Sequence, residues 1–393
     1  MNQQLKVLLI HNKYRLAGGE DTLAVNDAKM LREHGHTVME YIKDNSDIDN
    51  FSKWDKLLAP FRLCYSFKQS RELKRLIKEN QIDIIYAINL VPLIGFTVYR
   101  VAKKTGTPIV QSVNNFRYAC PGSSCIRNGE ICESCITKNS FSDALKYGCY
   151  RNSKLQTIIL CAAMRLHRML GSFDRVDCYT VPSGFNKSKL NGIVKDEKKI
   201  VVLNPTIPDE HTDITNASDR KYYVYAARLE KLKGIDVAVK AFEKLDYPLM
   251  VLGTGNMEEE MKQYVRGHNL SNIDFVGFCD RNKMREIFCN AKALLYPTQW
   301  YEGIPLTLLE SFSLGTPVIG SNIGNVGDCV RDGINGVTFQ YDDPEALAGA
   351  VMKMESPEML DRTIKGARQI YEENYSPDAY YNNLMAIFQK HIK

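Results

Sequence analysis

The stretch QWYEGIPLTLLESFSLGTPVIGSN, residues 299–322, contains a predicted helix followed by a predicted buried strand. Pro305 fits the first turn of that helix, because a missing N–H group costs no hydrogen bond there. Gly315 fits the end of the helix, where a left-handed residue closes the last turn. The apolar run after Gly315 reads as a strand, so the stretch predicts one helix–strand unit of a parallel sheet.

Two glutamates lie eight residues apart in this stretch, one before the helix and one inside it. Glu302 lies at the helix start with Gly303 and Ile304, where backbone N–H groups lack partners and the helix dipole favours an anion. Glu310 lies about two turns further along the helix. Because carboxylates accept hydrogen bonds from vicinal hydroxyls, the stretch predicts a site for an anion beside sugar hydroxyls. One capping and one surface glutamate would be the plainer alternative.

Outward from this stretch, strands and helices alternate along almost the whole chain, as in doubly wound parallel sheets. One alternating set fills residues 1–204 and a second fills 221–375, separated by the polar segment 205–220. We predict an α/β fold with two Rossmann-like domains that face each other across a cleft, with 205–220 as the linker. Such sheets bind ligands at the carboxyl ends of their strands, which places the predicted site in the cleft.

The composition is that of a globular protein, with 44% apolar and 25% charged residues among 393. The net charge is +5, and basic residues are concentrated in 51–80 and 138–175. These two segments are either solvated helix faces or a basic surface that meets an anionic membrane or lipid carrier. The N-terminus shows no secretory signal and no apolar run approaches the length of a membrane span, so we expect a cytoplasmic protein.

Two further motifs supply groups that suit a diphosphate. In YAARLEKLKG, Arg228 and Lys233 follow a predicted strand and precede a helix. Two cations there would clamp a diphosphate and stabilise the charge that develops as a nucleotide leaves; ordinary charges at a helix start are the alternative. In RLAGGEDT, Gly18 and Gly19 follow the first strand, and paired glycines let the backbone approach a ligand closely.

In this order the motifs resemble those of glycosyltransferase family 4, retaining nucleotide-sugar transferases of the GT-B fold, over nearly the whole chain. The most specific part is the E-x7-E string from Glu302 to Glu310, followed by GTPVIG and preceded by RLEKLKG. The resemblance implies that Glu302 contacts the donor sugar and Glu310 the ribose, while Arg228 and Lys233 bind the diphosphate. Further donor contacts that it implies come from the helix start, the glycine loop and the FVGF segment: Gly303, Ile304, Pro305, Leu306, Gly18, Gly19, Gly277 and Phe278.

The resemblance also implies that the two domains bind different substrates. Residues 1–204 would bind the acceptor, and the final helix, within 376–393, would cross back onto that domain. Residues 221–375 would bind the nucleotide-sugar donor.

The chain departs from the family on the acceptor side. Relatives often carry histidine where this chain has Asn114, Tyr86 and Ile88. Asn114 can bind a sugar hydroxyl, but it is no base at neutral pH. In the front-side mechanism inferred for the family, the departing phosphate oxygen takes the acceptor proton, so neither a protein base nor a cofactor is required. The residues expected to contact the acceptor are Asn114, Asn115 and Arg117.

A cysteine-rich insertion, residues 116–150, interrupts the alternation with a loop-like sequence. Cysteines of a cytoplasmic protein are thiols or metal ligands more often than disulfides. Two expectations stay open. The insertion either holds a structural Zn²⁺ at Cys120, Cys132, Cys135 and Cys149, or contains buried free thiols.

The helix expected over 154–172 is apolar on much of its surface, and is either a core helix or a patch on the bilayer surface. With the basic segments it suggests a glycan acceptor on a polyprenyl-diphosphate lipid, as in bacterial surface-polysaccharide assembly. The expected partners are a nucleotide-sugar donor, this acceptor and an anionic membrane surface, with no nucleic acid. The alternatives are a nucleotide-sugar 2-epimerase, an NAD-dependent oxidoreductase that lacks G-x-G-x-x-G, and a zinc-bearing nucleic-acid module.

Overall fold

The computed structural model describes residues 4–15, 18–52, 63–209 and 213–392. Contacts divide the chain into two compact units. Unit 1 comprises 1–127, 132–203 and 381–393, and unit 2 comprises 128–131 and 204–380. Each unit is built on its own six-stranded parallel sheet.

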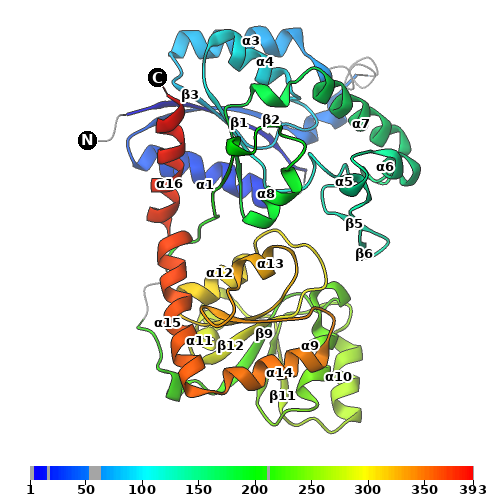
Figure 1. Ribbon diagram of the computed structural model, residues 1–393, viewed down its shortest axis with the longest axis vertical. Coiled ribbons are helices and arrows are strands. Elements are labelled where there is room, and N and C mark those ends of the chain that lie inside the picture. Colours follow the sequence, from blue (N-terminus) through cyan, green and yellow to red (C-terminus); the bar gives the residue numbers. More distant parts are fainter. Residues whose placement is uncertain (1–3, 16–17, 53–62, 210–212, 393) are drawn as a thin grey trace. The chain divides into compact units, whose positions relative to one another are not determined.

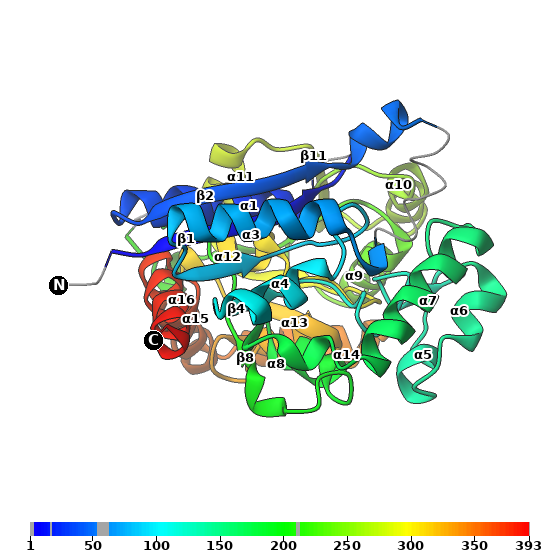
Figure 2. The same cartoon turned by 90° about the horizontal axis from the view of Figure 1, so that it is seen from above.

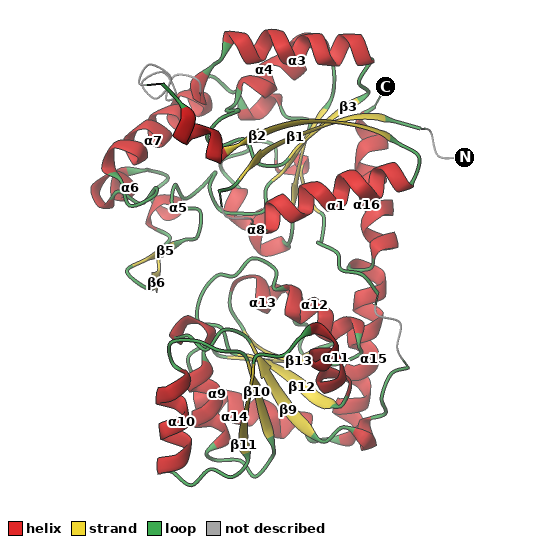
Figure 3. Cartoon of the chain, turned by 180° about the vertical axis from the view of Figure 1, so that it is seen from behind, coloured by secondary structure: helices red, strands yellow, loops and turns green. Residues whose placement is uncertain are grey.

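The sheet of unit 1 has the strand order β2-β1-β3-β4-β7-β8. The strands are buried apolar runs, as expected for a parallel sheet covered on both faces. Helices α3 and α4 cover one face and α1 and α16 cover the other (Figures 1 and 3). The strand bounds are β1 Lys6–Lys13, β2 Thr37–Asp44, β3 Ile84–Ala87, β4 Ile109–Ser112, β7 Cys178–Val181 and β8 Ile200–Val202. The helix bounds are α1 Gly19–Glu33, α3 Phe67–Asn80, α4 Thr97–Thr105, α7 Lys154–Met169 and α8 Gly184–Leu190, with short 3₁₀ helices η1 Asn45–Asn50, η2 Phe173–Arg175 and η3 Glu197–Lys199.

The insertion, residues 116–150, is more ordered than its loop-like sequence predicts. It contains a short hairpin, β5 Ile126–Arg127 and β6 Glu130–Ile131, and two short helices, α5 Ser134–Thr137 and α6 Ser142–Tyr147. Their lengths are too short for a periodic pattern to develop, which is why the sequence gives no signal for them. Helix α7 follows with Ser153 as its N-cap, the Ser153 hydroxyl accepting a hydrogen bond from Gln156 N. It runs beside α6 in the view from above (Figure 2).

The sheet of unit 2 has the strand order β11-β10-β9-β12-β13-β14. All its strands are parallel, and successive strands are added on one side of β9 up to β11 and on the other side from β12 onward. The strand bounds are β9 Tyr222–Ala226, β10 Leu249–Leu252, β11 Ile273–Gly277, β12 Ala291–Tyr296, β13 Val318–Ser321 and β14 Gly336–Phe339. The helix bounds are α9 Ile235–Phe242, α10 Glu258–Gly267, α11 Arg281–Cys289, α12 Leu306–Ser313, α13 Gly324–Cys329, α14 Pro344–Met354, α15 Pro357–Asn374 and α16 Pro377–His391, with 3₁₀ helices η4 Ala217–Asp219 and η5 Lys231–Lys233.

The segment predicted as a linker, 205–220, is packed into unit 2 where the structure describes it. Asp209 forms two hydrogen bonds with Arg368 of α15, at 2.8 and 2.7 Å. The buried Arg220 donates to Ala291 O at 2.7 Å and to Gly315 O at 3.1 Å. Polar residues of this segment therefore form ion pairs and hydrogen bonds with unit 2.

The last helix, α16, starts in unit 2 and ends in unit 1. Within unit 1, the Tyr381 hydroxyl lies 3.0 Å from His36 Nε2. Further along, the ring of Phe388 packs edge-on against Tyr86 of β3, with 5.5 Å between the ring centroids. No helix among the described residues is both long enough and apolar enough to traverse a lipid bilayer.

Candidate functional site

The carboxyl ends of β9 and β12 form the switch point of the unit 2 sheet, where doubly wound folds bind ligands. The segments that leave these strands are bonded together. Both the Thr298 hydroxyl, at 3.2 Å, and Gln299 N, at 2.9 Å, donate to Leu232 O. Gly234 makes this approach possible, because a Cβ on it would lie 1.9 Å from Pro297 O. The glycine of RLEKLKG is therefore required sterically.

Lys233 and Glu302, both predicted from the sequence, form an ion pair at this switch point. Lys233 Nζ lies 2.5 Å from Glu302 Oε1, and the two side chains are only 13% and 10% exposed. The same carboxylate oxygen accepts from the Thr298 hydroxyl at 3.1 Å and from Trp300 Nε1 at 2.8 Å. Asn325 Nδ2 fixes the backbone by donating to Glu302 O at 2.7 Å. The carboxylate is thus held in one position before any ligand arrives.

Two buried tyrosines beside this site keep their hydroxyl protons. Burial and the charge of Glu302 raise the pKa of Tyr225 and hold the pKa of Tyr296 well above the ordinary value. The Tyr225 hydroxyl lies within hydrogen-bond distance of two backbone carbonyl oxygens, Arg228 O at 3.2 Å and Lys233 O at 3.3 Å. It therefore braces the backbone that carries both predicted cations.

Arg228 and Glu310 are the other two charged residues predicted for the donor site. The Arg228 side chain is 67% exposed, and Arg228 Nη1 pairs with Glu230 Oε1 at 2.7 Å. Glu310 is half-buried within α12. The structure therefore brings Lys233 and Glu302 together and leaves Arg228 extended into solvent.

The start of α12 offers backbone donors as expected, with one correction. Pro305 is the N-cap of α12 rather than a residue of its first turn, because its ψ of 124° is extended. The helix end was predicted correctly, since Gly315 has φ +64°. In the described part of the chain, the amides of Gly303, Ile304, Leu306 and Thr307 donate no hydrogen bond.

Two exposed apolar side chains belong to the predicted donor residues of unit 2. Phe278, directly after β11, is 82% exposed, and Leu306 at the start of α12 is 54% exposed. Gly277 has φ +81° and turns the chain so that Phe278 leaves the sheet. An exposed aromatic ring beyond a strand end can stack on a planar base.

The sequence reading missed two glycines that shape the same edge. A Cβ on Gly253 would lie 2.1 Å from Ala227 O, and one on Gly255 would lie 2.3 Å from Leu229 O. They let the chain after β10 run against the segment that carries Arg228. The signal was present, since Gly-Thr-Gly directly follows a predicted strand.

In unit 1, Gly18 and Gly19 start α1 at the carboxyl end of β1. The sequence reading missed Asp21, whose carboxylate holds this turn. It accepts from Gly18 N at 2.9 Å and Tyr14 N at 3.1 Å, and lies 2.7 Å from His11 Nε2. An acid three residues after a helix N-cap is the capping-box spacing, which was available as a signal.

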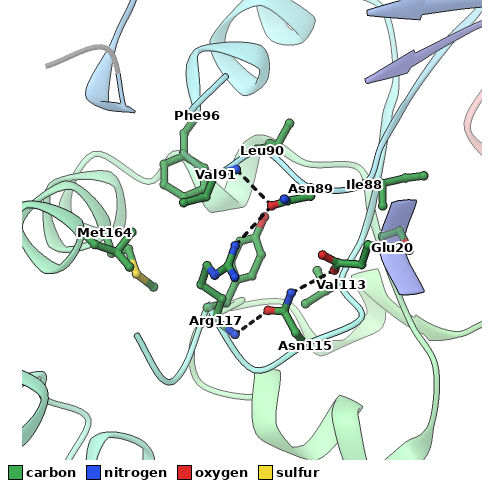
Figure 4. Close-up of a pocket in the computed structure, with 13 residues that line it drawn as sticks. Glu20, Ile88, Asn89, Leu90, Val91, Phe96, Val113, Asn115, Arg117 and Met164 are labelled. Carbon is green, nitrogen blue, oxygen red and sulfur yellow. Dashed lines mark hydrogen bonds between the residues drawn. The ribbon is translucent and has the colours of Figure 1, made fainter. Parts of the chain in front are cut away.

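A small cavity of about 20 Å³, lined by both polar and apolar side chains, lies at the switch point of the unit 1 sheet, beyond β1, β3 and β4 (Figure 4). Asn115 Nδ2 donates to Glu20 Oε1 at 3.0 Å, and Arg117 N donates to Asn115 Oδ1 at 2.9 Å. Arg117 Nη1 lies 3.4 Å from Asn89 Oδ1, while the buried Arg117 Nε has no partner. The Tyr14 hydroxyl donates to the other oxygen of Glu20.

Two of the three predicted acceptor residues, Asn115 and Arg117, therefore share this cavity. Asn114 does not line it, and its Nδ2 donates to Ser112 Oγ at 2.9 Å instead. Glu20 and Asn89 were not predicted. Their approach depends on which strands are neighbours in the sheet, which a local pattern does not reveal.

The cysteines of the insertion are free thiols in the structure. Gly122 lies beside two of them, since a Cβ on it would be 3.7 Å from Cys120 Sγ and from Cys149 Cβ. Within the described ranges, no group of three or more His, Cys, Asp or Glu side chains is arranged to hold a metal ion. The zinc set Cys120, Cys132, Cys135 and Cys149 stays a prediction.

Solved glycosyltransferase structures match the chain over almost its full length. The lipopolysaccharide outer core galactosyltransferase WaaB, in its apo form, is 17% identical with a TM-score of 0.67, covering 98% of this chain and 100% of that chain. Anabaena Alr3699/HepE in complex with UDP-glucose is 14% identical with a TM-score of 0.61, covering 99% and 100%. At these identities the likeness shows the fold, and it confirms the predicted α/β GT-B class.

The family match falls on unit 2. Residues 207–370 match the family described as Glycosyl transferases group 1. The O-antigen chain mannosyltransferase C of Escherichia coli is 24% identical over 224 residues, which is 53% of this chain and 60% of the relative. The chain spans 60% or less of the length of the curated relatives it matches. The matched segment contains the Lys233–Glu302 pair.

Proposed function

We propose that this chain is a retaining glycosyltransferase that moves a sugar from a nucleotide-sugar donor to a glycan acceptor. The observation that carries the proposal is the preformed Lys233–Glu302 pair at the switch point of unit 2, beside the unpaired amides at the start of α12. A cation and a helix N-terminus suit a diphosphate, and a fixed carboxylate suits sugar hydroxyls.

Each donor-side group takes a role that its position supports. Lys233 and the amides of Gly303 and Ile304 bind the diphosphate, and Arg228 swings from Glu230 to join them. Glu302 accepts from hydroxyls of the donor sugar, and Glu310 from the ribose. Phe278, turned outward by Gly277, packs against the base. The similarity of the fold to HepE, whose structure was determined with UDP-glucose, supports a nucleotide sugar as ligand.

The chemistry follows from these charges. As the bond between the anomeric carbon and the phosphate breaks, negative charge grows on the diphosphate, and Lys233 with the helix amides stabilises it. The leaving phosphate oxygen takes the proton of the acceptor hydroxyl on the same face of the sugar, so configuration is retained. Neither a protein base nor a metal cofactor has to act in this route.

The acceptor we propose is a lipid-linked glycan of bacterial surface-polysaccharide assembly, at the cytoplasmic face of a membrane. Support comes from the O-antigen mannosyltransferase and WaaB as relatives and from the surface of α7. Exposed apolar side chains follow one another along that helix, flanked by basic residues: Leu155, Ile158, Leu166 and Met169, with Arg151, Lys154 and Arg165. Such a surface suits an anionic bilayer. Flotation with anionic vesicles at low and high salt tests it, and no flotation at low salt would contradict it.

A donor screen tests the proposed activity. Nucleotide sugars with different bases and sugars are added to wild-type protein and to Glu310→Gln, and the melting temperature is measured. We expect one donor to stabilise wild type, because ligand binding to the folded state raises stability. Its effect should be smaller in Glu310→Gln, which loses an acceptor for ribose hydroxyls. A screen in which no nucleotide sugar stabilises the protein would contradict the proposal.

A further inference from the structure

A second, much larger cavity lies in unit 1, with a volume of about 830 Å³. Its walls come from η1 and the end of β2, from the start of α3, from the turn after β3, and from the first half of α7. We call it the α3–α7 groove. Pockets of roughly 300–1,000 Å³ are the size that holds a drug-sized or cofactor-sized ligand.

One side of the α3–α7 groove is apolar. Leu63, Val91 and Leu160 are buried beneath it, Ile159 is half-buried, and Leu155 is 68% exposed at its edge. Of these residues, Leu155 and Ile159 are in contact with water and would be covered by a bound ligand. A ligand that covers these side chains would therefore have an apolar portion.

The other side carries positive charge. Lys43, Lys68 and Arg151 line the groove and form no ion pair with a carboxylate in the described part of the chain. Of the two acids in the lining, Glu72 already accepts a hydrogen bond from the Tyr41 hydroxyl at 2.9 Å. With Arg15 the lining contains four cations against two carboxylates, Asp47 and Glu72, so it carries a net positive charge. A net positive charge beside apolar side chains is complementary to a ligand with a phosphate group on a long apolar chain.

The α3–α7 groove adjoins two other features of unit 1. Val91 and Leu160 line both the groove and the small cavity that contains Asn115 and Arg117 (Figure 4). At the opposite edge, Leu155 begins the exposed apolar row of α7.

We infer that the α3–α7 groove binds the isoprenoid phosphate portion of a lipid-linked acceptor, with Lys43, Lys68 and Arg151 on the phosphate and Leu155 and Ile159 on the chain. This inference rests on the proposed function and names the place where the lipid portion of the substrate binds.

Direct binding to the full chain tests the inference. The probe is geranylgeranyl monophosphate in neutral detergent. Its two halves, geranylgeraniol and inorganic phosphate, are tested separately for comparison. The intact probe should bind about tenfold more tightly than either half, because chain burial and phosphate contacts act together. Lys43→Ala combined with Lys68→Ala should weaken it about fivefold, whereas Lys104→Ala, on the exposed end of α4, should not.

A pair of variants on one helix separates the groove from general membrane adhesion. Leu155→Gln should weaken binding of the probe about fivefold, since Leu155 lines the groove. Ile158→Gln, also exposed on α7 but outside the groove, should not. Equal weakening by both variants, equal binding of geranylgeraniol, or equally tight binding to phosphatidylglycerol vesicles would overturn the inference.

The donor screen on the same proteins distinguishes the two proposals. If the probe does not bind but a nucleotide sugar still stabilises the chain, the lipid assignment is wrong and the glycosyltransferase assignment stands. If the probe binds and no nucleotide sugar does, the groove is real and the proposed activity is wrong.

Discussion

Lys233 Nζ and Glu302 Oε1 lie 2.5 Å apart, in two loops that leave neighbouring strands of the unit 2 sheet. Both groups are nearly buried, so each would be costly to leave without its partner. A diphosphate would provide Lys233 with a second anion, and Glu302 would then be shared with sugar hydroxyls. In the unliganded protein, the pair therefore already has the arrangement that the proposed donor requires.

Glu302→Gln tests the carboxylate. The amide oxygen can still accept from Thr298 and Trp300, but the charge that pairs with the nearly buried Lys233 is lost, so stability should also fall and rates are measured at a temperature where the variant is folded. We expect transfer to fall about a hundredfold, since the negative charge near the developing oxocarbenium is gone. Initial rates with the donor found in the screen measure this. Glu259→Gln, exposed on α10, is the control, and a Glu302→Gln rate within a few-fold of that control would contradict the assigned role.

Gly234→Ala tests the contact between the two loops. The new Cβ would meet Pro297 O at 1.9 Å with φ at +72°, so we expect unfolding free energy to fall by about 3 kcal/mol. Gly349→Ala, inside α14 with nothing within 4 Å, should raise it by about 1 kcal/mol. Urea denaturation measures both. Equal stability of the two variants would show that the loops are not held as described.

The attachment of α16 to unit 1 should depend on pH. Burial and the neighbouring His34 lower the pKa of His36 below its ordinary value. His36 Nδ1 accepts from Leu5 N at 3.1 Å, so Nε2 carries the proton and faces the Tyr381 hydroxyl. The unfolded chain therefore binds a proton at higher pH than the folded chain, and stability should fall as pH drops below about 6.5.

Urea unfolding of wild type and His36→Gln at a series of pH values measures this loss. His36→Gln removes the group whose pKa differs between the two states, so its stability should depend less steeply on pH below about 6.5. His167, whose pKa burial also lowers, remains in both proteins and contributes equally. Identical pH dependence of the two proteins would contradict a coupling through His36.

Metal analysis decides between the two expectations for the insertion. If Cys120, Cys132, Cys135 and Cys149 hold a structural ion, purified protein should contain about one zinc per chain and lose it with unfolding of the insertion under chelation. Cys329 is buried in unit 2, so Cys329→Ala is the control and should leave the zinc content per chain unchanged. Protein with no zinc and reactive thiols in the insertion would establish free cysteines.

The sequence predicted the elements whose signals are local. The β12–α12–β13 unit, the glycine after α12 and the two parallel sheets follow from apolar runs and helix stops within short stretches. Trp300 and Asn325, which fix Glu302, lie in loops, and their role depends on how those loops fold back on one another. The pairing of Glu20 with Asn115 joins residues that are 95 positions apart, which no local pattern encodes.

Packing adds information that the sequence did not contain about two predicted features. The segment 205–220 has the composition of a linker, yet Asp209 and Arg220 bind groups of unit 2. Arg228 was expected beside Lys233 because both flank one turn, but its side chain points to solvent and pairs with Glu230. Side-chain direction in a short loop depends on tertiary contacts, and sequence spacing does not determine it.

Calorimetric titration of the nucleoside diphosphate selected by the donor screen tests the central claim most directly. Wild type, Lys233→Ala and Lys244→Ala are compared, because Lys244 is an exposed lysine of the same unit that pairs only with Glu345 in the described residues. We predict tight binding to wild type and Lys244→Ala, and binding at least about tenfold weaker to Lys233→Ala. Equal affinity of all three proteins, or no binding to wild type, would contradict the account.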